Sequence, residues 1–412
     1  MIRNWKKNFA VFITSQAISL LGSSLVQYAI TWHVTLTTGS GVSMTVMILC
    51  AILPTFFLAP FAGVWADRYS RKTLVMVSDG CIAACTLILA IVFLCGYQAI
   101  WLLYVASVIR ALGAAVQTPC VSAMLPDLVP EKHLSRANGI NSTVNSVIAL
   151  GSPVLGAALL KLSDLTPIFF IDVVTAAAAI LVMLFYLKVP KKEKAPATSG
   201  KQYFRELREG IRYILRHKYL WILFVFMAVF FFFAAPVAFL TPLQVTRNYS
   251  GNVWHLSAIE IVFSVGMLLG GLLMSVWAGL KNRVVTMALG TGALAICTFF
   301  LGAPISFVLY LALMALSGLA IPVFNTPATV ILQERVDPDY MGRVFGVMTM
   351  FNSSFMPLGM LAFGPLADSI AIEGLLLGTG FIIFFASLAI LFCRPLMVAG
   401  RKKRAGTGGG VG

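Results

Sequence analysis

Ionisable side chains inside long apolar segments are the residues of this chain that could do chemistry. Arg110 lies about 15 Å along its segment at 1.5 Å per residue, and Asp79 and Glu260 lie within two others. A charge in hydrocarbon costs at least a few kcal/mol, so each should face a partner or water. A carboxyl group in a partly dry cavity can load and release a proton. Asp79 and Glu260 are therefore candidate proton-coupling residues, with a static ion pair or a position at the membrane surface as the open alternatives.

A polar stripe follows one face of the first apolar segment. Its members recur at spacings of three, four and four residues, which places them on one side of a helix. Such a stripe should line a cavity rather than face lipid. The stripe comprises Gln16, Ser19, Ser23 and Gln27. Asn145 in the fifth segment and Phe230 in the seventh are further candidates for the cavity wall, although most phenylalanines should pack or face lipid.

The composition indicates an integral membrane protein. Of 412 residues, 59% are hydrophobic and 11% are charged, against about 25% charged in soluble domains. The net charge of +15 does not indicate nucleic-acid binding, because the bases lie in short links between apolar runs. The seven cysteines and four histidines form no cluster, so we expect neither a disulfide framework nor a metal site, and no cofactor.

Twelve apolar segments are long enough to cross a bilayer, which needs roughly 20 helical residues. The sequence therefore predicts an all-α integral membrane fold with twelve transmembrane helices. The segments are Phe9–Trp32, Ser43–Ala62, Leu74–Cys95, Ile100–Pro119, Gly139–Leu160, Pro167–Leu187, Leu220–Leu243, Leu256–Leu280, Val284–Gly302, Ile305–Phe324, Phe345–Leu366 and Gly374–Cys393.

The distribution of basic residues supports this count. With the N-terminus placed in the cytoplasm, almost all of the 30 lysines and arginines fall in the two tails and the even-numbered links. Lys161 and Arg247 are the bases in links on the other side. Membrane proteins retain bases on the cytoplasmic side, so we predict a multi-pass protein with both termini in the cytoplasm.

The longest link divides the segments into two sets of six. From Tyr203 to Tyr219 this link is amphipathic, and such a helix should lie on the inner leaflet. Several residues of the first half recur in the second at a near-constant offset. We predict two pseudo-symmetric six-helix bundles at 1–187 and 220–394, a cytoplasmic linker at 188–219 and a basic cytoplasmic tail at 395–412. The recurring pairs are Pro119 and Pro327, Pro130 and Pro338, Arg136 and Arg343, and Gly139 and Gly346.

The link between the second and third segments reads Gly-x-x-x-Asp-Arg-x-x-Arg-Lys. This pattern resembles the loop signature of the major facilitator superfamily of secondary transporters. The resemblance implies parallel six-helix repeats with a transport site at their interface. It also implies a gating role, with a topogenic basic loop as the alternative, for Gly63, Asp67, Arg68, Arg71 and Lys72.

We expect Asp67 to interact with the start of the eleventh helix, around Gly342–Gly346, where the positive end of the helix dipole suits an anion. The corresponding link of the second half, Gly279–Arg283, lacks an acid and is expected to be only a remnant of the pattern.

Two helices resemble proton-coupled members of the same superfamily. Arg110 followed by Gly113 resembles the Arg-x-x-x-Gly pattern of the fourth helix, with the glycine one place early. This implies proton coupling for Arg110, with a structural ion pair as the alternative. The fifth helix resembles the Gly/Pro-rich signature of the antiporters, in which glycines permit close packing and proline allows a bend. That implies a gating role for Gly151, Pro153 and Gly156.

Stretches along the whole chain resemble the macrolide-efflux branch of the bacterial drug–proton antiporters, among them Ala258–Leu273 and Gln333–Phe345. The resemblance implies an inner-membrane exporter of hydrophobic small molecules that works by alternating access. Its expected partners are protons, the cargo and membrane lipid, with no nucleic acid, and we expect it to function as a monomer. No Gly-x-x-x-x-Gly-Lys-Ser/Thr loop occurs, so an ion gradient should supply the energy.

Other classes of protein stay open. They are a passive facilitator, an exporter of another small molecule, a non-transporting membrane sensor and a membrane-embedded enzyme. An enzyme would need a cluster of catalytic groups, and the histidines form none.

Overall fold

The computed structural model describes residues 5–130, 133–187, 200–249, 252–277 and 279–401. Within these ranges the chain is helical, and the only β-type pairing is an isolated bridge between Asn282 and Arg401. The chain divides into two compact units. The N-terminal unit holds Met1–Tyr203 with Val245–Ile261, and the C-terminal unit holds Phe204–Gln244 with Val262–Gly412.

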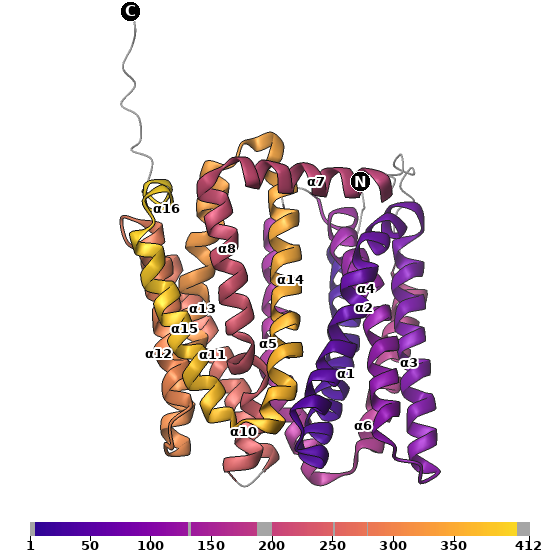
Figure 1. The fold of residues 1–412 in the computed structure, drawn as a ribbon. Helices are drawn as coiled ribbons and strands as arrows, with labels where there is room; N and C mark the ends of the chain where they lie inside the picture. Colours follow the sequence, from indigo (N-terminus) through magenta and orange to yellow (C-terminus); the bar gives the residue numbers. More distant parts are fainter. Residues whose placement is uncertain (1–4, 131–132, 188–199, 250–251, 278, 402–412) are drawn as a thin grey trace, which may run out of the picture. The chain divides into compact units, whose positions relative to one another are not determined.

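The N-terminal unit is built on a bundle of six long helices (Figure 1). Within it α1 packs against α5 and α6, α2 against α4, and α3 against α4 and α6. Ser40 and Ser70 begin α2 and α3 by accepting a hydrogen bond from a backbone N–H of the first turn. The helices are α1 (Trp5–Thr38), α2 (Gly41–Arg68), α3 (Arg71–Leu94), α4 (Ile100–Leu128), α5 (Leu134–Leu162) and α6 (Leu165–Tyr186).

The C-terminal part of the chain repeats these pairings. There α12 packs against α13 and α15, and α8 packs against α14 and α15. Its helices are α7 (Gly200–Arg216), α8 (Lys218–Phe233), α9 (Ala235–Phe239), α10 (Thr241–Asn248), α11 (Val253–Trp277), α12 (Arg283–Leu301), α13 (Phe307–Arg335), α14 (Pro338–Ser369), α15 (Ile372–Phe392) and α16 (Arg394–Ala399). The predicted all-α membrane fold with two pseudo-symmetric sets of helices is confirmed.

The twelve predicted membrane segments all coincide with helices, but the seventh is broken. Among the described residues, eleven helices are individually long and apolar enough to span a bilayer, and α8 supplies a twelfth together with α7, from which it is bent by 112°. The predicted segment Leu220–Leu243 is not one helix, because it is interrupted at Ala234 and Leu240. Pro236 lies in the first turn of α9, where its missing N–H is tolerated but the preceding helix cannot continue.

The domain limits predicted from the sequence stay predictions. The polar part of the linker, 188–199, and most of the basic tail, 402–412, lie outside the described residues. The amphipathic stretch of the linker is helical as α7.

Small residues allow α11 and α13 to approach closely. A Cβ atom added to Gly266 would overlap the carbonyl group of Ala315, and one added to Gly318 would overlap the carbonyl group of Phe263. Gly271, one helical turn further along α11, is exposed and has nothing within 4 Å of the equivalent position. The close approach of α11 and α13 therefore depends on the absence of side chains at Gly266 and Gly318.

Gly266→Ala is expected to destabilise the protein by about 1–3 kcal/mol, because a methyl group forces the α11 and α13 backbones apart. Gly271→Ala is the matched control and should leave stability unchanged or slightly raised. Thermal unfolding of both purified variants measures the difference. Equal stability of the two variants would contradict the close contact.

Candidate functional site

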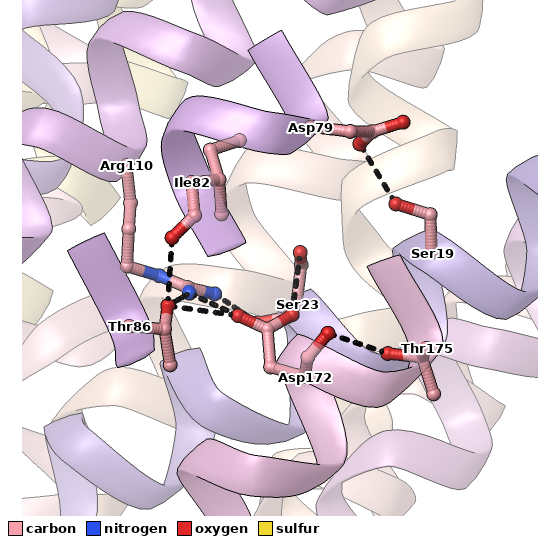
Figure 2. A network of polar contacts seen from close by, with 8 residues as sticks. All are labelled: Ser19, Ser23, Asp79, Ile82, Thr86, Arg110, Asp172 and Thr175. Atoms are coloured by element: carbon pink, nitrogen blue, oxygen red, sulfur yellow. Dashed lines mark hydrogen bonds and ion pairs between the residues drawn. The ribbon is translucent and has the colours of Figure 1, made fainter. Parts of the chain in front are cut away.

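Arg110 lies in the interior of the N-terminal unit and forms an ion pair with Asp172 of α6 (Figure 2). Its Nη1 atom lies 2.5 Å from Asp172 Oδ2. The two side chains are 6% and 0% exposed, so this is a pair removed from solvent. Its Nη2 group donates to the backbone carbonyl of Ser23 in α1 at 3.0 Å. Arg110 thus faces a buried partner. Such an ion pair was the alternative to proton coupling by Arg110 in the sequence analysis.

Neutral side chains complete the surroundings of this ion pair. Ser23 donates to Asp172 Oδ1 at 3.1 Å, and Thr86 of α3 lies 3.0 Å from Asp172 Oδ2. Arg110 Nη1 also donates to the Thr86 hydroxyl at 2.6 Å. Both carboxylate oxygens are satisfied, as a buried charge requires. The network joins α1, α3, α4 and α6 across the bundle.

Asp79 of α3 forms a second buried carboxyl site in the same unit. Ser19 of α1 and Gln117 of α4 both donate to its Oδ1 atom, each at 2.8 Å. The side chain is 2% exposed, and its Oδ2 atom has no hydrogen-bond partner among the described residues. Among the described residues no base pairs with Asp79, in contrast to Asp172. The Asp79 carboxyl group is thus held by neutral donors at one of its two oxygens.

The polar stripe of α1 is turned mainly into the N-terminal unit. Ser19 and Ser23, four residues apart, each hold a different carboxyl group, Asp79 and Asp172. Gln16 is 9% exposed and donates to Met183 Sδ at 3.5 Å, and Gln27 contacts Thr31 of its own helix. Serine contacts between helices therefore account for the centre of the stripe, and cavity lining by these residues stays a prediction.

Glu260 is a second intramembrane acid, besides Asp79, that pairs with no base among the described residues. It lies in α11 within the N-terminal unit, is partly buried, and forms no hydrogen bond or ion pair with the residues that the structure describes. Tyr28 of α1 lies in its neighbourhood. The Tyr28 ring lies 5.3 Å from that of Trp32. Glu260 thus combines low exposure, an aromatic neighbour and a free carboxyl group.

The predicted gating residues of α5 lie in one continuous helix. Pro153 is buried inside α5 without interrupting it. Gly156 is buried against α1, since a Cβ there would lie 3.6 Å from both Tyr28 and Trp32. Gly151 has no neighbour within 4 Å of that position, and Asn145 is exposed. Of the two glycines, Gly156 lies close to another helix and Gly151 does not. Gating by α5 stays a prediction.

Two bases of the patterned link tie helix ends together. Arg71 binds Asp127 of α4 at 2.5 Å and the Ala123 carbonyl at 2.8 Å. Lys72 donates to the carbonyls of Leu184 and Leu187 at the end of α6, at 3.2 and 2.8 Å. Gly63, Asp67 and Arg68 belong to the last turns of α2, but their surroundings lie outside what the structure describes.

Phe230 belongs to an aromatic cluster in the C-terminal unit. Its ring lies 4.4 Å from that of Phe324 and 5.4 Å from that of Phe231, and the side chain is 2% exposed. In this structure it packs with its neighbours, so its role in a cavity wall stays a prediction.

The comparison with known proteins decides the family. A sequence profile of the Major Facilitator Superfamily matches residues 12–360. The chain belongs to this superfamily. Macrolide efflux protein A of Streptococcus pyogenes is 30% identical over 382 residues, with 92% of this chain and 94% of the relative covered. Multidrug resistance protein MdtG of Citrobacter koseri is 27% identical, with 88% and 87% covered.

Two solved transporter structures share the fold of this chain. The nucleoside transporter NupG is 15% identical, with a TM-score of 0.73, and the match covers 94% of this chain and all of that one (100%). A bacterial homologue of the iron transporter ferroportin, in an inward-facing state, is 14% identical with a TM-score of 0.71, and the match covers 93% and 98% of the two chains. Membership of the Major Facilitator Superfamily, shown by the profile and by the efflux relative, makes this chain a multi-pass membrane transporter and not an enzyme.

The transporter carries a further ion pair, at the start of α12, that was not predicted from the sequence. Arg283, the first residue of α12, binds Glu334 near the end of α13 at 2.6 Å. It is the counterpart of Arg71 and Asp127, which join the start of α3 to the end of α4. The expectation that Gly279–Arg283 is only a remnant overlooked this pair, because its acid lies on another helix. The sequence did contain a signal for this pair, because Glu334 occupies the position in the second half that Asp127 occupies in the first.

Proposed function

We propose that this transporter exports hydrophobic small molecules, macrolide-type compounds among them, from the cytoplasm in exchange for protons. The observation that carries the proposal is the 30% identity to macrolide efflux protein A, which extends over 92% of this chain. The lower identity to a multidrug resistance protein over 88% of the chain supports a broad cargo class. Alternating access supplies the transport cycle, with the cargo site open to one side of the membrane at a time.

Glu260 is our first choice for the proton-coupling residue. A carboxyl group without a counter-charge in a partly dry site prefers to be neutral, and it ionises when water reaches it. Alternating access to Glu260 would therefore load a proton from the outside and release it to the cytoplasm. Asp79 is the second choice, because one of its oxygens is unsatisfied among the described residues.

Arg110 fills a different role in this proposal. Its charge is balanced by Asp172 at 2.5 Å, so the pair organises the four helices that it joins. Arg110 then acts in coupling as a positioning residue through α1, where Ser23 binds Asp172 and Ser19 binds Asp79.

The links at helix ends would let each bundle move as a body. Arg71 and Lys72 join α3 to the ends of α4 and α6, and Arg283 joins α12 to α13. The distribution of bases supports a bacterial cytoplasmic membrane location with both termini inside. The predicted gating residues and monomeric state belong to the same proposal.

Accumulation of a labelled macrolide in bacteria tests the function. Cells that express the transporter should accumulate several-fold less compound than cells with an empty vector, and an uncoupler should abolish the difference. Efflux that persists with the uncoupler would instead indicate a facilitator. Equal accumulation across a panel of hydrophobic cations and macrolides would refute export of this cargo class.

A further inference from the structure

The orientation of α7 sets it apart from the spanning helices. It ends at Arg216, and α8 leaves it at an angle of 112°. Figure 1 shows α7 running across the end of α8. Because α8 is almost wholly apolar and is expected to cross the membrane, a helix at this angle to it should run along the bilayer surface. The positions of the α7 side chains around the helix axis therefore decide which residues contact the protein and which are exposed.

One face of α7 is fastened to the start of α14. The Tyr213 hydroxyl donates to Asp337 Oδ2 at 3.0 Å and accepts from the Asp337 backbone N–H at 3.2 Å. The Tyr213 ring stacks on Tyr340 with centroids 4.6 Å apart. Gly210 is buried where a Cβ would lie 2.8 Å from the carbonyl oxygen of Arg343. This face is fully used by contacts within the C-terminal unit.

The opposite face of α7 carries four exposed arginines. Arg205, Arg208, Arg212 and Arg216 are spaced three, four and four residues apart, which aligns them in a row along the helix. Ile211 and Leu215, 36% and 57% exposed, lie beside this row. We call the four arginines the basic face. Among the described side chains, Glu209 binds Arg343 at 3.2 Å and lies further from Arg205, at 3.9 Å.

We propose that the basic face of α7 binds the phosphate headgroups of anionic phospholipids. Guanidinium groups match phosphate oxygens with paired hydrogen bonds. The exposed Ile211 and Leu215 side chains can enter the acyl region next to those headgroups. A lipid surface offers anionic headgroups beside acyl chains, so the row of charges and its apolar flank together favour a lipid surface. The proposal is independent of the cargo and of proton coupling.

Headgroup binding has a consequence for the C-terminal unit. Because the other face of α7 holds Asp337 and Tyr340 at the start of α14, lipid that fixes α7 also fixes this helix end. Neither Arg208 nor Arg212 forms an ion pair with a side chain that the structure describes. Their removal therefore tests lipid binding without breaking a described internal contact.

The experiment compares the full-length protein in nanodiscs of phosphatidylcholine with and without phosphatidylglycerol. Phosphatidylglycerol should raise the Tm of the wild type by about 2–4 °C. Arg208→Gln/Arg212→Gln should lose at least half of this gain. The gain should also vanish at about 1 M salt, where screening reduces the range of the charges to about 3 Å.

Lys281→Gln/Arg394→Gln is the matched control, since it removes two exposed bases of the same unit that lie outside α7. It should keep the full gain in Tm. A gain that survives in the α7 variant, or that the control loses equally, would overturn the proposal. Mass spectrometry of lipids retained after purification gives an independent readout, in which only the α7 variant should lose phosphatidylglycerol.

Discussion

Arg110→Met is expected to destabilise the N-terminal unit by about 3–5 kcal/mol, because it leaves a buried carboxylate without its cation. Asp172 is fully buried, and Arg110 is the base that pairs with it in the described structure. Thermal unfolding can be followed with a thiol-reactive dye, since Cys120 of α4 is buried and becomes accessible on unfolding. The variant should unfold at a markedly lower temperature than the wild type.

The double variant Arg110→Met/Asp172→Leu separates a structural role from a coupling role. Removal of both charges should recover much of the lost stability, because no unpaired charge is left in the interior. If the Arg110→Met variant is as stable as the wild type, the ion pair does not stabilise the fold. Recovered stability without recovered proton-driven transport would support the positioning role proposed for Arg110.

Glu260→Gln is expected to lower pH-gradient-driven transport by about tenfold or more, since an amide cannot load or release a proton. Exchange of cargo across the membrane without a gradient should continue, because that reaction needs no net proton movement. The stability of the variant should equal or exceed that of the wild type, as Glu260 has no ion pair to lose among the described residues. Transport and exchange in proteoliposomes provide the two readouts.

Ser257→Ala is a matched control for Glu260→Gln, one turn away on the same helix. The Ser257 hydroxyl is buried and has no partner among the described residues, so its removal should leave transport unchanged. Asp79→Asn is assayed in parallel. If Glu260→Gln keeps gradient-driven transport and Asp79→Asn loses it, Asp79 is the coupling residue. Wild-type gradient-driven transport in both acid variants would exclude the two residues as coupling sites.

The membrane fold was predictable because hydrocarbon imposes simple rules on a sequence. A spanning helix must be long and apolar, and bases collect in alternate links, so the segments from Phe9–Trp32 to Gly374–Cys393 coincide with helices. The break in the seventh segment was missed. A proline within an apolar run, such as Pro236, is compatible with a kink as well as an interruption, and the choice depends on neighbouring helices.

The interior of the candidate site was less predictable, because it depends on contacts between distant segments. The burial of Arg110 required a partner, and Asp172 was among the acids in apolar segments, but nothing in the spacing joined the fourth helix to the sixth. In the α1 stripe, Ser19 and Ser23 donate to carboxyl groups of two other helices, and cavity lining by the stripe stays a prediction. Helical periodicity identifies such a face without identifying the helix that covers it.

The pair of Arg283 and Glu334 illustrates the same restriction. Its charges come from two helices, so a motif search confined to one link could not find it. The internal repeat could have done so, because Arg71 and Asp127 occupy equivalent positions in the first half. Repeat symmetry therefore carries information about contacts that single motifs do not.

Proton-driven export is tested most directly with the purified protein in proteoliposomes under an imposed pH gradient. A labelled macrolide should accumulate in vesicles with an acidic interior, protons should leave as it enters, and an ionophore that collapses the gradient should stop both movements. Equal macrolide movement with and without the gradient, or movement without proton flux, would contradict proton-coupled antiport.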